Sequence, residues 1–442
     1  RVLDQFRTSL GIANASLIDI RGNHDAFDVG LRNGDRDVYQ RNGAKGTEWS
    51  QGRILIDPIF GSSACPSHCF VGVDLSPEIG LRSPTNFFGT VTDEIIQEFE
   101  TKISLDMQHW YAEGCDPVYI TYGHYPLSVT GKEERFFVFD QHGLRRVFLK
   151  YGISAWLCGH LHDEFGNHLH LVHFGDASAF LELEVTDWKW KRRFRIMAID
   201  GRHLSFMDFE LQNATLPAIK PLSSDARIDG AVVMITYPPS PHFSPLGNLV
   251  PVPEISEVHA LVWPMDSSTD SLRVSAVLYC GKDTLKTIPM TSAEGSSLYK
   301  GDLWSESDES LCEGASLSVQ VKAETEGTNR LSLSERRLIE SRQRPMRYPN
   351  SLLERLVLSI PWYSFFQNLF ISFILFHVIV LLLVPKALPY FKSFRQDDSP
   401  DLDEVPGNGN GSSGSSCLSI LLKPVHGFVY ASQHRQIGRA HV

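Results

Sequence analysis

Gly22-Asn23-His24-Asp25 places polar, metal-binding side chains directly after an apolar run at residues 16–20. Two later stretches repeat this arrangement: Gly123-His124-Tyr125-Pro126 follows residues 117–121, and Gly159-His160-Leu161-His162 follows residues 153–157. Short apolar runs bounded by Gly are typical of interior strands. Loops at the carboxyl ends of strands in an open α/β sheet line the crevice where ligands bind. The three stretches therefore predict an α/β sheet with one polar site at its edge.

The side chains of these stretches suit a metal ion. Neutral imidazole nitrogens and an amide oxygen are ligands for ions of the Zn, Mn or Fe class. Each motif alone occurs by chance, but three in order, each at a strand end, indicate a metal site. The alternative interpretation is a set of loop histidines satisfied by backbone hydrogen bonds.

The ordered motifs resemble those of the calcineurin-like metallophosphoesterases over roughly residues 1–210. That family carries D-x-H, G-D, G-N-H-D/E, G-H-x-x and G-H-x-H, and the last three are present here. We expect the first two upstream, because the chain begins at Arg1 without Met, shortly before the third motif. The resemblance implies a β-sandwich flanked by helices. It also implies that this chain holds about half of a dinuclear site and is a fragment without activity of its own.

The resemblance implies a role for each candidate ligand. Asn23, His124 and His160 would bind one metal ion and His162 the other, so the expected cofactors are two divalent ions of the Mn, Fe or Zn class. The implied reaction is hydrolysis of a phosphomonoester or phosphodiester by attack of a metal-bridging hydroxide.

His24 would not bind metal in this interpretation. Its imidazole would face the substrate, where it steadies charge on the phosphoryl oxygens or protonates the leaving oxygen. Asp25 would orient that imidazole, as carboxylates behind a functional His do. The alternative function is a non-catalytic, membrane-bound scaffold that uses the same fold. The retained His24 argues against a scaffold, which has no need of a general acid.

Helices and further strands are predicted between and after the motifs. Residues 92–107 read as an amphipathic helix with acids in its first turn, and residues 144–151 as a shorter helix ending at Gly152. His168, His170 and His173 alternate along a strand-like run and are interpreted as exposed or locally bonded.

A basic run with tryptophans at residues 188–193 is either the solvated end of a hairpin, which we favour, or a phosphate-binding or nucleic-acid-binding patch. The net charge of −11 argues against nucleic acid as a partner. Residues 86–89 and 187–189 fit one membrane-anchored group of the family.

Residues 228–340 differ from the first part of the chain, because they are rich in Ser, Thr and Val with period-two runs. The pattern predicts short strands at residues 231–236, 257–262, 272–277 and 316–321, and hence an immunoglobulin-like or fibronectin-like β-sandwich. Cys280 and Cys312 could pair across it, and Cys65 with Cys69 elsewhere, although Cys65, Cys69, Cys115 and Cys158 could also be buried thiols.

Residues 365–384 form a run without a formal charge, long enough for at least one transmembrane helix. We expect an integral protein of the endomembrane system or cell surface. Glycosylation sequons at Asn14 and Asn213 would suit a lumenal catalytic region. Residues 396–416 are expected to form a disordered linker. Residues 417–442 are interpreted as a tail of doubtful authenticity, whose last residues, 437–442, look foreign and are left out of fold reasoning.

Overall fold

The computed structural model describes residues 18–43, 45–49, 51–62, 65–77, 87–132, 143–162, 169–188, 191–201, 203–212, 219–239, 256–265, 272–294, 296–303, 312, 317–325, 327, 330–339 and 352–394. Chain contacts divide it into one compact unit, Arg1–Ile374, and a second, Leu375–Val442. Several predicted features lie outside the described residues: both sequons, His168, the linker at 396–416 and the tail at 417–442.

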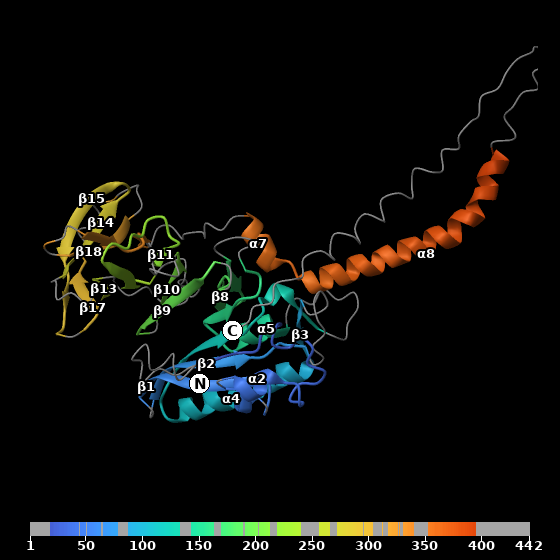
Figure 1. Ribbon diagram of the computed structural model, residues 1–442, viewed down its shortest axis with the longest axis horizontal. Coiled ribbons are helices and arrows are strands. Elements are labelled where there is room, and N and C mark those ends of the chain that lie inside the picture. The colour runs from blue at the N-terminus through green and yellow to red at the C-terminus, as the bar shows by residue number, and fades with distance from the viewer. Residues whose placement is uncertain are drawn as a thin grey trace, which may run out of the picture. The chain divides into compact units, whose positions relative to one another are not determined.

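A six-stranded sheet forms the centre of the first part of the chain (Figure 1). Its strands, in spatial order, are β1 (Ile54–Ser62), β2 (Cys65–Val73), β4 (Val118–Tyr122), β6 (Ala155–Cys158), β8 (Ala179–Glu184) and β7 (His170–Phe174). The four inner strands run parallel, whereas β1 and β7 are antiparallel edges. The strands predicted before the second and third motifs are therefore confirmed as β4 and β6.

Two helices cover one face of this sheet. Helix α4 (Asp93–Ala112) begins after Thr92, whose hydroxyl accepts a hydrogen bond from the Ile95 amide at 3.3 Å. Helix α5 (Gly143–Lys150) ends before Gly152, which adopts the left-handed conformation with φ of 62°. Both helices were predicted. Their apolar faces and the sheet form one core, which includes Phe99, Phe148 and Trp156.

A three-stranded antiparallel sheet covers the opposite face. It consists of β9 (Arg193–Asp200), β10 (His203–Leu211) and β11 (Ile219–Pro221). Ile199 and Leu204 pack against the core residues of β4, and Phe206 packs against Leu181 and Leu183 of β8. The first part of the chain is thus an α/β sandwich with helices outside. Its shorter elements are α2 (Val38–Asn42), α3 (Gly46–Trp49), β3 (Gly89–Val91), η1 (Leu127–Val129) and β5 (Thr130–Lys132).

Two antiparallel sheets form a second sandwich, as the alternating pattern predicts. One contains β12 (Ala231–Tyr237), β13 (Glu257–Pro264), β17 (Leu298–Asp302) and β16 (Thr291–Ser292); the other contains β15 (Asp283–Pro289), β14 (Leu272–Cys280), β18 (Leu317–Thr325), β19 (Arg330–Leu333) and β20 (Arg337–Leu338). Their inward side chains form a separate core. The predicted Cys280–Cys312 disulfide is present.

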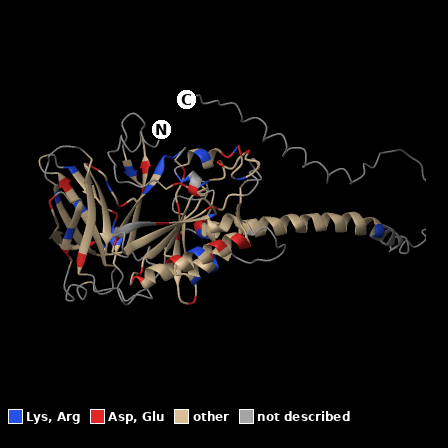
Figure 2. Ribbon diagram, turned by 90° about the horizontal axis from the view of Figure 1, so that it is seen from below, with Lys and Arg blue, Asp and Glu red and all other residues tan. Residues whose placement is uncertain are grey.

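The chain ends its described part with two helices, α7 (Leu352–Ser359) and α8 (Trp362–Phe394). Among the described helices, α8 supplies the one stretch long and apolar enough to cross a membrane, Trp362–Lys386. Its mean hydropathy is 2.5, and its most apolar part is not buried against the protein. Figure 2 shows α8 almost free of charged residues. The expected span at 365–384 lies inside this stretch.

Three expectations are wrong in detail. Residues 18–20 pair with no described strand, because the Asp19 carbonyl instead accepts a bond from Trp49 Nε1 and its carboxylate one from the Lys45 amide. Cys65 is bonded to Cys115, not Cys69, because β2 brings Cys65 beside the end of α4; Cys69 and Cys158 are buried free thiols.

The third concerns the alternating histidines: the expected exposure is wrong, whereas local bonding is confirmed for His173, whose Nε2 lies 2.6 Å from Glu182 Oε2. His170 and His173 are both buried, because the β7 edge is covered on both faces at these positions.

Candidate functional site

Three of the predicted ligands lie together at the carboxyl edge of the six-stranded sheet. His124 follows β4 and His160 follows β6, so the parallel pairing of these two strands brings their loops side by side. His124 Nε2 is 3.0 Å from Asn23 Oδ1 and 3.1 Å from His160 Nδ1. Residues distant in the sequence therefore place one amide oxygen and two ring nitrogens around a common point.

Both imidazoles are held neutral. Burial is the main cause: it lowers the pKa of His124 to about 3 and that of His160 to about 4, and for His160 a hydrogen bond to the Phe87 backbone opposes part of the shift. His24 and His162 contribute to both shifts through their charge, so all four imidazoles lie within electrostatic range of one another. A neutral imidazole keeps the lone pair that a metal ligand needs.

The donor atoms fit a metal ion. His160 Nε2 is buried and has no hydrogen-bond partner, which is costly for a polar atom unless a ligand satisfies it. Atoms about 3 Å apart have the spacing of adjacent ligands at about 2.0–2.2 Å from one ion. The described residues contain no metal-binding group made of three or more His, Cys, Asp or Glu side chains. The third candidate ligand beside His124 and His160 is therefore the amide oxygen of Asn23.

The loop after β6 has an unusual backbone. His160 and His162 both have positive φ, 88° and 58°, a region that His tolerates at some cost. Glu184, at the end of the adjacent strand β8, accepts the Leu161 amide at 2.8 Å through Oε1 and also bonds the His162 amide. Burial raises the pKa of Glu184 well above its usual value. This buried carboxyl fixes the turn that carries two of the predicted ligands.

Glu182 acts in the same way on the loop after β4. Its Oε1 accepts the Leu127 amide at 2.7 Å, and its Oε2 is 2.6 Å from His173 Nε2. Leu127 begins η1, three residues after His124. Glu182 and Glu184 are the functional residues that the sequence interpretation missed. The alternation of acids with apolar residues in an apolar strand of the sheet was the available signal.

The remaining predicted site residues are His24, Asp25 and His162. His24 and Asp25 are exposed, and His162 is half-buried. Asp25 Oδ2 accepts the Gly22 amide at 2.9 Å, so its carboxylate closes the turn that presents His24. The orientation of His24 by Asp25 stays a prediction.

Charged residues beneath this turn are paired with one another. Arg21 contacts Asp37 at 2.7 Å, Arg32 contacts Asp74 at 2.9 Å, and all four side chains are nearly inaccessible. Asp74 follows β2 at the same sheet edge. Asp74 thus lies among the guanidinium groups of Arg21, Arg32 and Arg53.

Aromatic side chains enclose the histidines. Phe87 and Tyr125 both lie with ring centroids 4.8 Å from the ring of His160. Gly22 also approaches closely: a Cβ there would be 3.1 Å from the ring of His124. The Gly22-Asn23-His24-Asp25 motif therefore needs its Gly so that the Asn23 turn can reach the imidazole.

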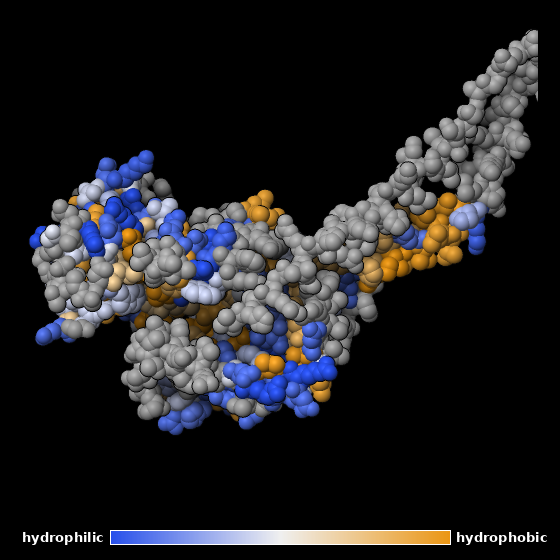
Figure 3. Space-filling model, in the orientation of Figure 1, coloured by the Kyte–Doolittle hydropathy of each residue, from blue (hydrophilic) through white to orange (hydrophobic). Residues whose placement is uncertain are grey.

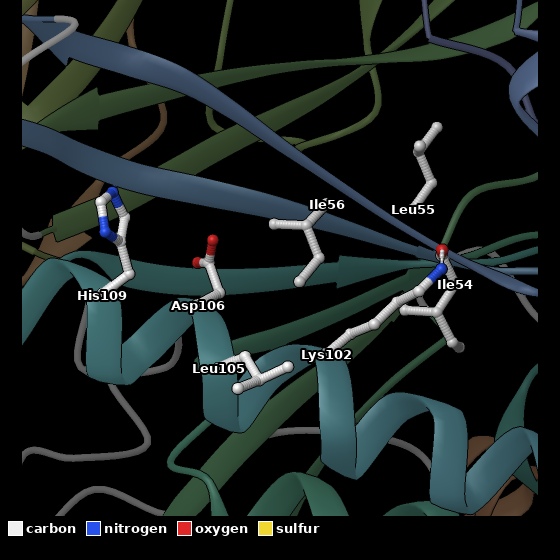
Figure 4. A pocket seen from close by; sticks show the side chains of 7 residues that line it. All are labelled: Ile54, Leu55, Ile56, Lys102, Leu105, Asp106 and His109. Atoms are coloured by element: carbon white, nitrogen blue, oxygen red, sulfur yellow. Dashed lines mark hydrogen bonds between the residues drawn. The ribbon is translucent and has the colours of Figure 1, made fainter.

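A shallow hollow of about 430 Å³ lies elsewhere, between β1 and α4 (Figure 4). Its lining includes Ile56, Lys102, Asp106 and His109. Lys102 donates to the Ile54 carbonyl, and Asp106 accepts from the Tyr119 hydroxyl. None of the predicted site residues lines it, so this hollow is separate from the histidine cluster.

The first part of the chain matches a known protein family. Residues 5–164 match the family model for calcineurin-like phosphoesterase, which includes all three motifs. No solved structure matches the chain.

Two curated proteins are similar. One, from Arabidopsis thaliana and named "Putative metallophosphoesterase", is 33% identical over 235 residues, which cover 46% of this chain and 30% of that protein. The other, mouse transmembrane protein 62, is 31% identical over 194 residues, which cover 43% of this chain and 26% of that protein. The matches thus span less than a third of either relative.

Proposed function

Because residues 5–164 belong to the calcineurin-like phosphoesterase family, a family that implies phosphoester hydrolysis, we propose that the intact protein is a membrane-anchored, dinuclear-metal phosphoesterase. Its substrate is a phosphomonoester or phosphodiester. The observation that carries the proposal is the position of His124 Nε2, 3.0 Å from Asn23 Oδ1 and 3.1 Å from His160 Nδ1.

We assign metal binding and proton donation to different residues of this chain. Asn23, His124 and His160 would hold one divalent ion of the Mn, Fe or Zn class, and His162 would contribute to the second. Bound divalent ions supply a water of lowered pKa and offset charge on the phosphoryl oxygens. His24, exposed on its turn, donates a hydrogen bond to a phosphoryl oxygen or a proton to the leaving oxygen.

The β8 carboxyls keep this arrangement ready. Glu182 and Glu184 hold the loops after β4 and β6 through backbone bonds, so the imidazoles need not reorganise when an ion binds. Neutral imidazoles at His124 and His160 remove the need to displace protons.

The domain order, the membrane anchor and the compartment are inferred from features outside the histidine cluster. We infer a phosphoesterase domain over residues 1–210 and an immunoglobulin-like sandwich over 228–340, followed by a span within Trp362–Lys386. Two disulfides, Cys65–Cys115 and Cys280–Cys312, suit an oxidising compartment and support a lumenal catalytic domain. Transmembrane protein 62, similar to this chain, is named for a membrane location.

The test is metal-dependent turnover by the intact protein. Hydrolysis of p-nitrophenyl phosphate and bis(p-nitrophenyl) phosphate is measured after EDTA treatment and again with Mn²⁺, Zn²⁺ or Fe²⁺ added. We expect EDTA to abolish hydrolysis and one of these ions to restore it. If no ion supports turnover while the protein stays folded, the non-catalytic scaffold replaces the enzyme as the best account.

A further inference from the structure

Helix α7 carries leucines on the side that the protein does not cover. Val357 and Leu358 are buried in the core of the phosphoesterase domain, whereas Leu352 is 73% exposed and Leu353 59% exposed. Leu356, one turn from both, is also exposed. Figure 3 shows a hydrophobic patch over α7. Packing onto the domain accounts for one face of this helix and leaves the leucine face, Leu352, Leu353 and Leu356, without an occupant.

The leucine face is continuous with the candidate membrane span. Helix α7 ends at Ser359 and the span begins at Trp362, whose Nε1 donates to the Val357 carbonyl at 2.8 Å. Arg355, exposed beside these leucines, has the charge that anionic lipid headgroups attract. An apolar helix face next to a span, with a cation at its border, has the composition of a helix that lies in the membrane interface.

The first turn of α8 is fixed to the phosphoesterase domain. The ring of Tyr363 lies 5.4 Å from that of Phe88, edge to face, and the ring of Phe366 lies 6.4 Å from it. Any side chain at Gly131, in β5, would collide with the ring of Tyr363. The start of the span is therefore packed on the β3–β5 pair and is not a free tether.

The same aromatic contacts lead to the site. Phe87 and Phe88 have ring centroids 5.1 Å apart, and Phe87 lies 4.8 Å from the ring of His160. Two phenylalanines thus connect a candidate metal ligand with Tyr363, in the first turn of the span. A membrane entered at Trp362 places the histidine cluster close to the lipid headgroups.

Resting on the proposed phosphoesterase function, we propose that the leucine face of α7 lies in the membrane interface and that the site hydrolyses a phosphoester of a lipid headgroup. In that step the oxygen of water forms a bond to phosphorus and the bond from phosphorus to the leaving oxygen breaks. His24 gives its proton to the leaving oxygen, and the proton of the attacking water passes to solvent.

The position of α7 is tested without any activity. In the intact protein with Cys417→Ser, a nitroxide is attached at Leu353→Cys, and in a matched control at Leu105→Cys, which replaces a leucine of α4 that is 61% exposed. The two free cysteines of the described residues are buried. In phosphatidylcholine vesicles we expect the label at 353 to collide with oxygen and to be shielded from a water-soluble nickel complex, unlike the label at 105. Equal access of nickel at both positions, or shielding from oxygen and nickel alike by a protein partner, would overturn the proposal.

The substrate class is tested with two probes. Wild type and the variant Leu352→Ser, Leu353→Ser, Leu356→Ser are compared on soluble p-nitrophenyl phosphate and on phosphatidylcholine vesicles that contain phosphatidic acid, with Leu105→Ser as control. We expect release of phosphate, phosphocholine or a lipid alcohol from vesicles, reduced about tenfold in the triple variant only, while the soluble rate is retained.

The outcomes separate the two proposals. Turnover of the soluble ester without turnover in vesicles overturns the lipid substrate and leaves the phosphoesterase function standing. Turnover of neither probe, with every ion added, counts against the phosphoesterase function itself. Equal loss on both probes in the triple variant shows that the leucines serve the fold, which also overturns the proposal.

Discussion

Strands β8 and β18 each lie inside a sheet, are buried on both faces over most of their length and carry polar residues at alternate positions. Glu182 and Glu184 of β8 bond the backbone of the loops that carry His124 and His160. Gln320 of β18 bonds the Asp225 and Ser334 carbonyls, each at 3.0 Å, and so ties two connecting segments of the second sandwich to its sheet.

The difference lies in what the buried polar groups hold. Both strands use buried polar side chains to bond neighbouring backbone groups, as burial favours. In β8 the partners are loops with candidate ligands, so loss of a bond should move the site. In β18 the partners carry no candidate chemistry, so loss of a bond should cost stability alone. Burial and hydrogen bonding therefore do not identify a functional residue until the partner is named.

Removing the imidazoles themselves should give the largest effect. His160→Ala in the intact protein is expected to lose the metal and at least about a thousandfold in turnover, since it removes a ligand. His24→Ala should lose a factor of about 10²–10⁴ in turnover with metal content near normal, because it removes a proton donor only. Metal analysis and hydrolysis rates, measured together, check this. Equal metal loss in both variants would contradict the assigned roles.

Substitution in β8 should come next. Glu184→Ala removes the acceptor for the Leu161 and His162 amides, and we expect metal affinity to fall about 10–100-fold. Glu184→Gln should restore most of that affinity, because burial raises the pKa of Glu184 and an amide oxygen can replace a neutral carboxyl. Titration with Mn²⁺ measures both. Equal affinity loss in the Ala and Gln variants would show that charge, not loop position, is what matters.

Gln320→Ala is the matched substitution in β18. It leaves two carbonyl groups without their bond, and we expect the free energy of unfolding to fall by about 1–3 kcal/mol. Turnover and metal affinity should stay at the wild-type level. Denaturant unfolding and Mn²⁺ titration of the same sample test this. Weakened metal binding in the Gln320 variant would contradict the claim that β18, unlike β8, affects stability alone.

Acid should act on the site through the same imidazoles. In the metal-free protein the pKa values of His124 and His160, about 3 and about 4, lie below the unfolded value of about 6.5. The unfolded chain therefore binds more protons between these values, and stability should fall as the pH drops from 6.5 to 4, by up to about 1.4 kcal/mol per pH unit for each imidazole. Unfolding at pH 7, 6 and 5 in EDTA should show a shallower slope for His124→Asn, and an unchanged slope would contradict the burial of a neutral imidazole.

Features that depend on local sequence were predicted well. The strand ends that carry His124 and His160, the helix that begins after Thr92, and the alternating strands of the second sandwich all follow from short patterns. Such patterns report which face of an element is buried, and the carboxyl ends of parallel strands in one sheet share an edge.

Features that depend on distant pairing were not predicted. The Cys65–Cys115 disulfide, the Arg32–Asp74 pair and the bond from Glu184 to the Leu161 amide join residues that no short pattern relates. The role of Glu184 is missed because a carboxylate in a strand is normally exposed. Only the order of β6 beside β8 shows that this carboxyl is buried under a ligand-bearing loop.

The central claim is that Asn23, His124 and His160 hold a divalent ion. The most direct measurement is a crystal structure of the intact protein soaked in Mn²⁺, with anomalous data collected at the manganese edge. The account predicts an anomalous peak within about 2.0–2.3 Å of Asn23 Oδ1 and of one ring nitrogen each from His124 and His160. A peak at other residues only, with these three side chains still bonded to one another, would contradict it.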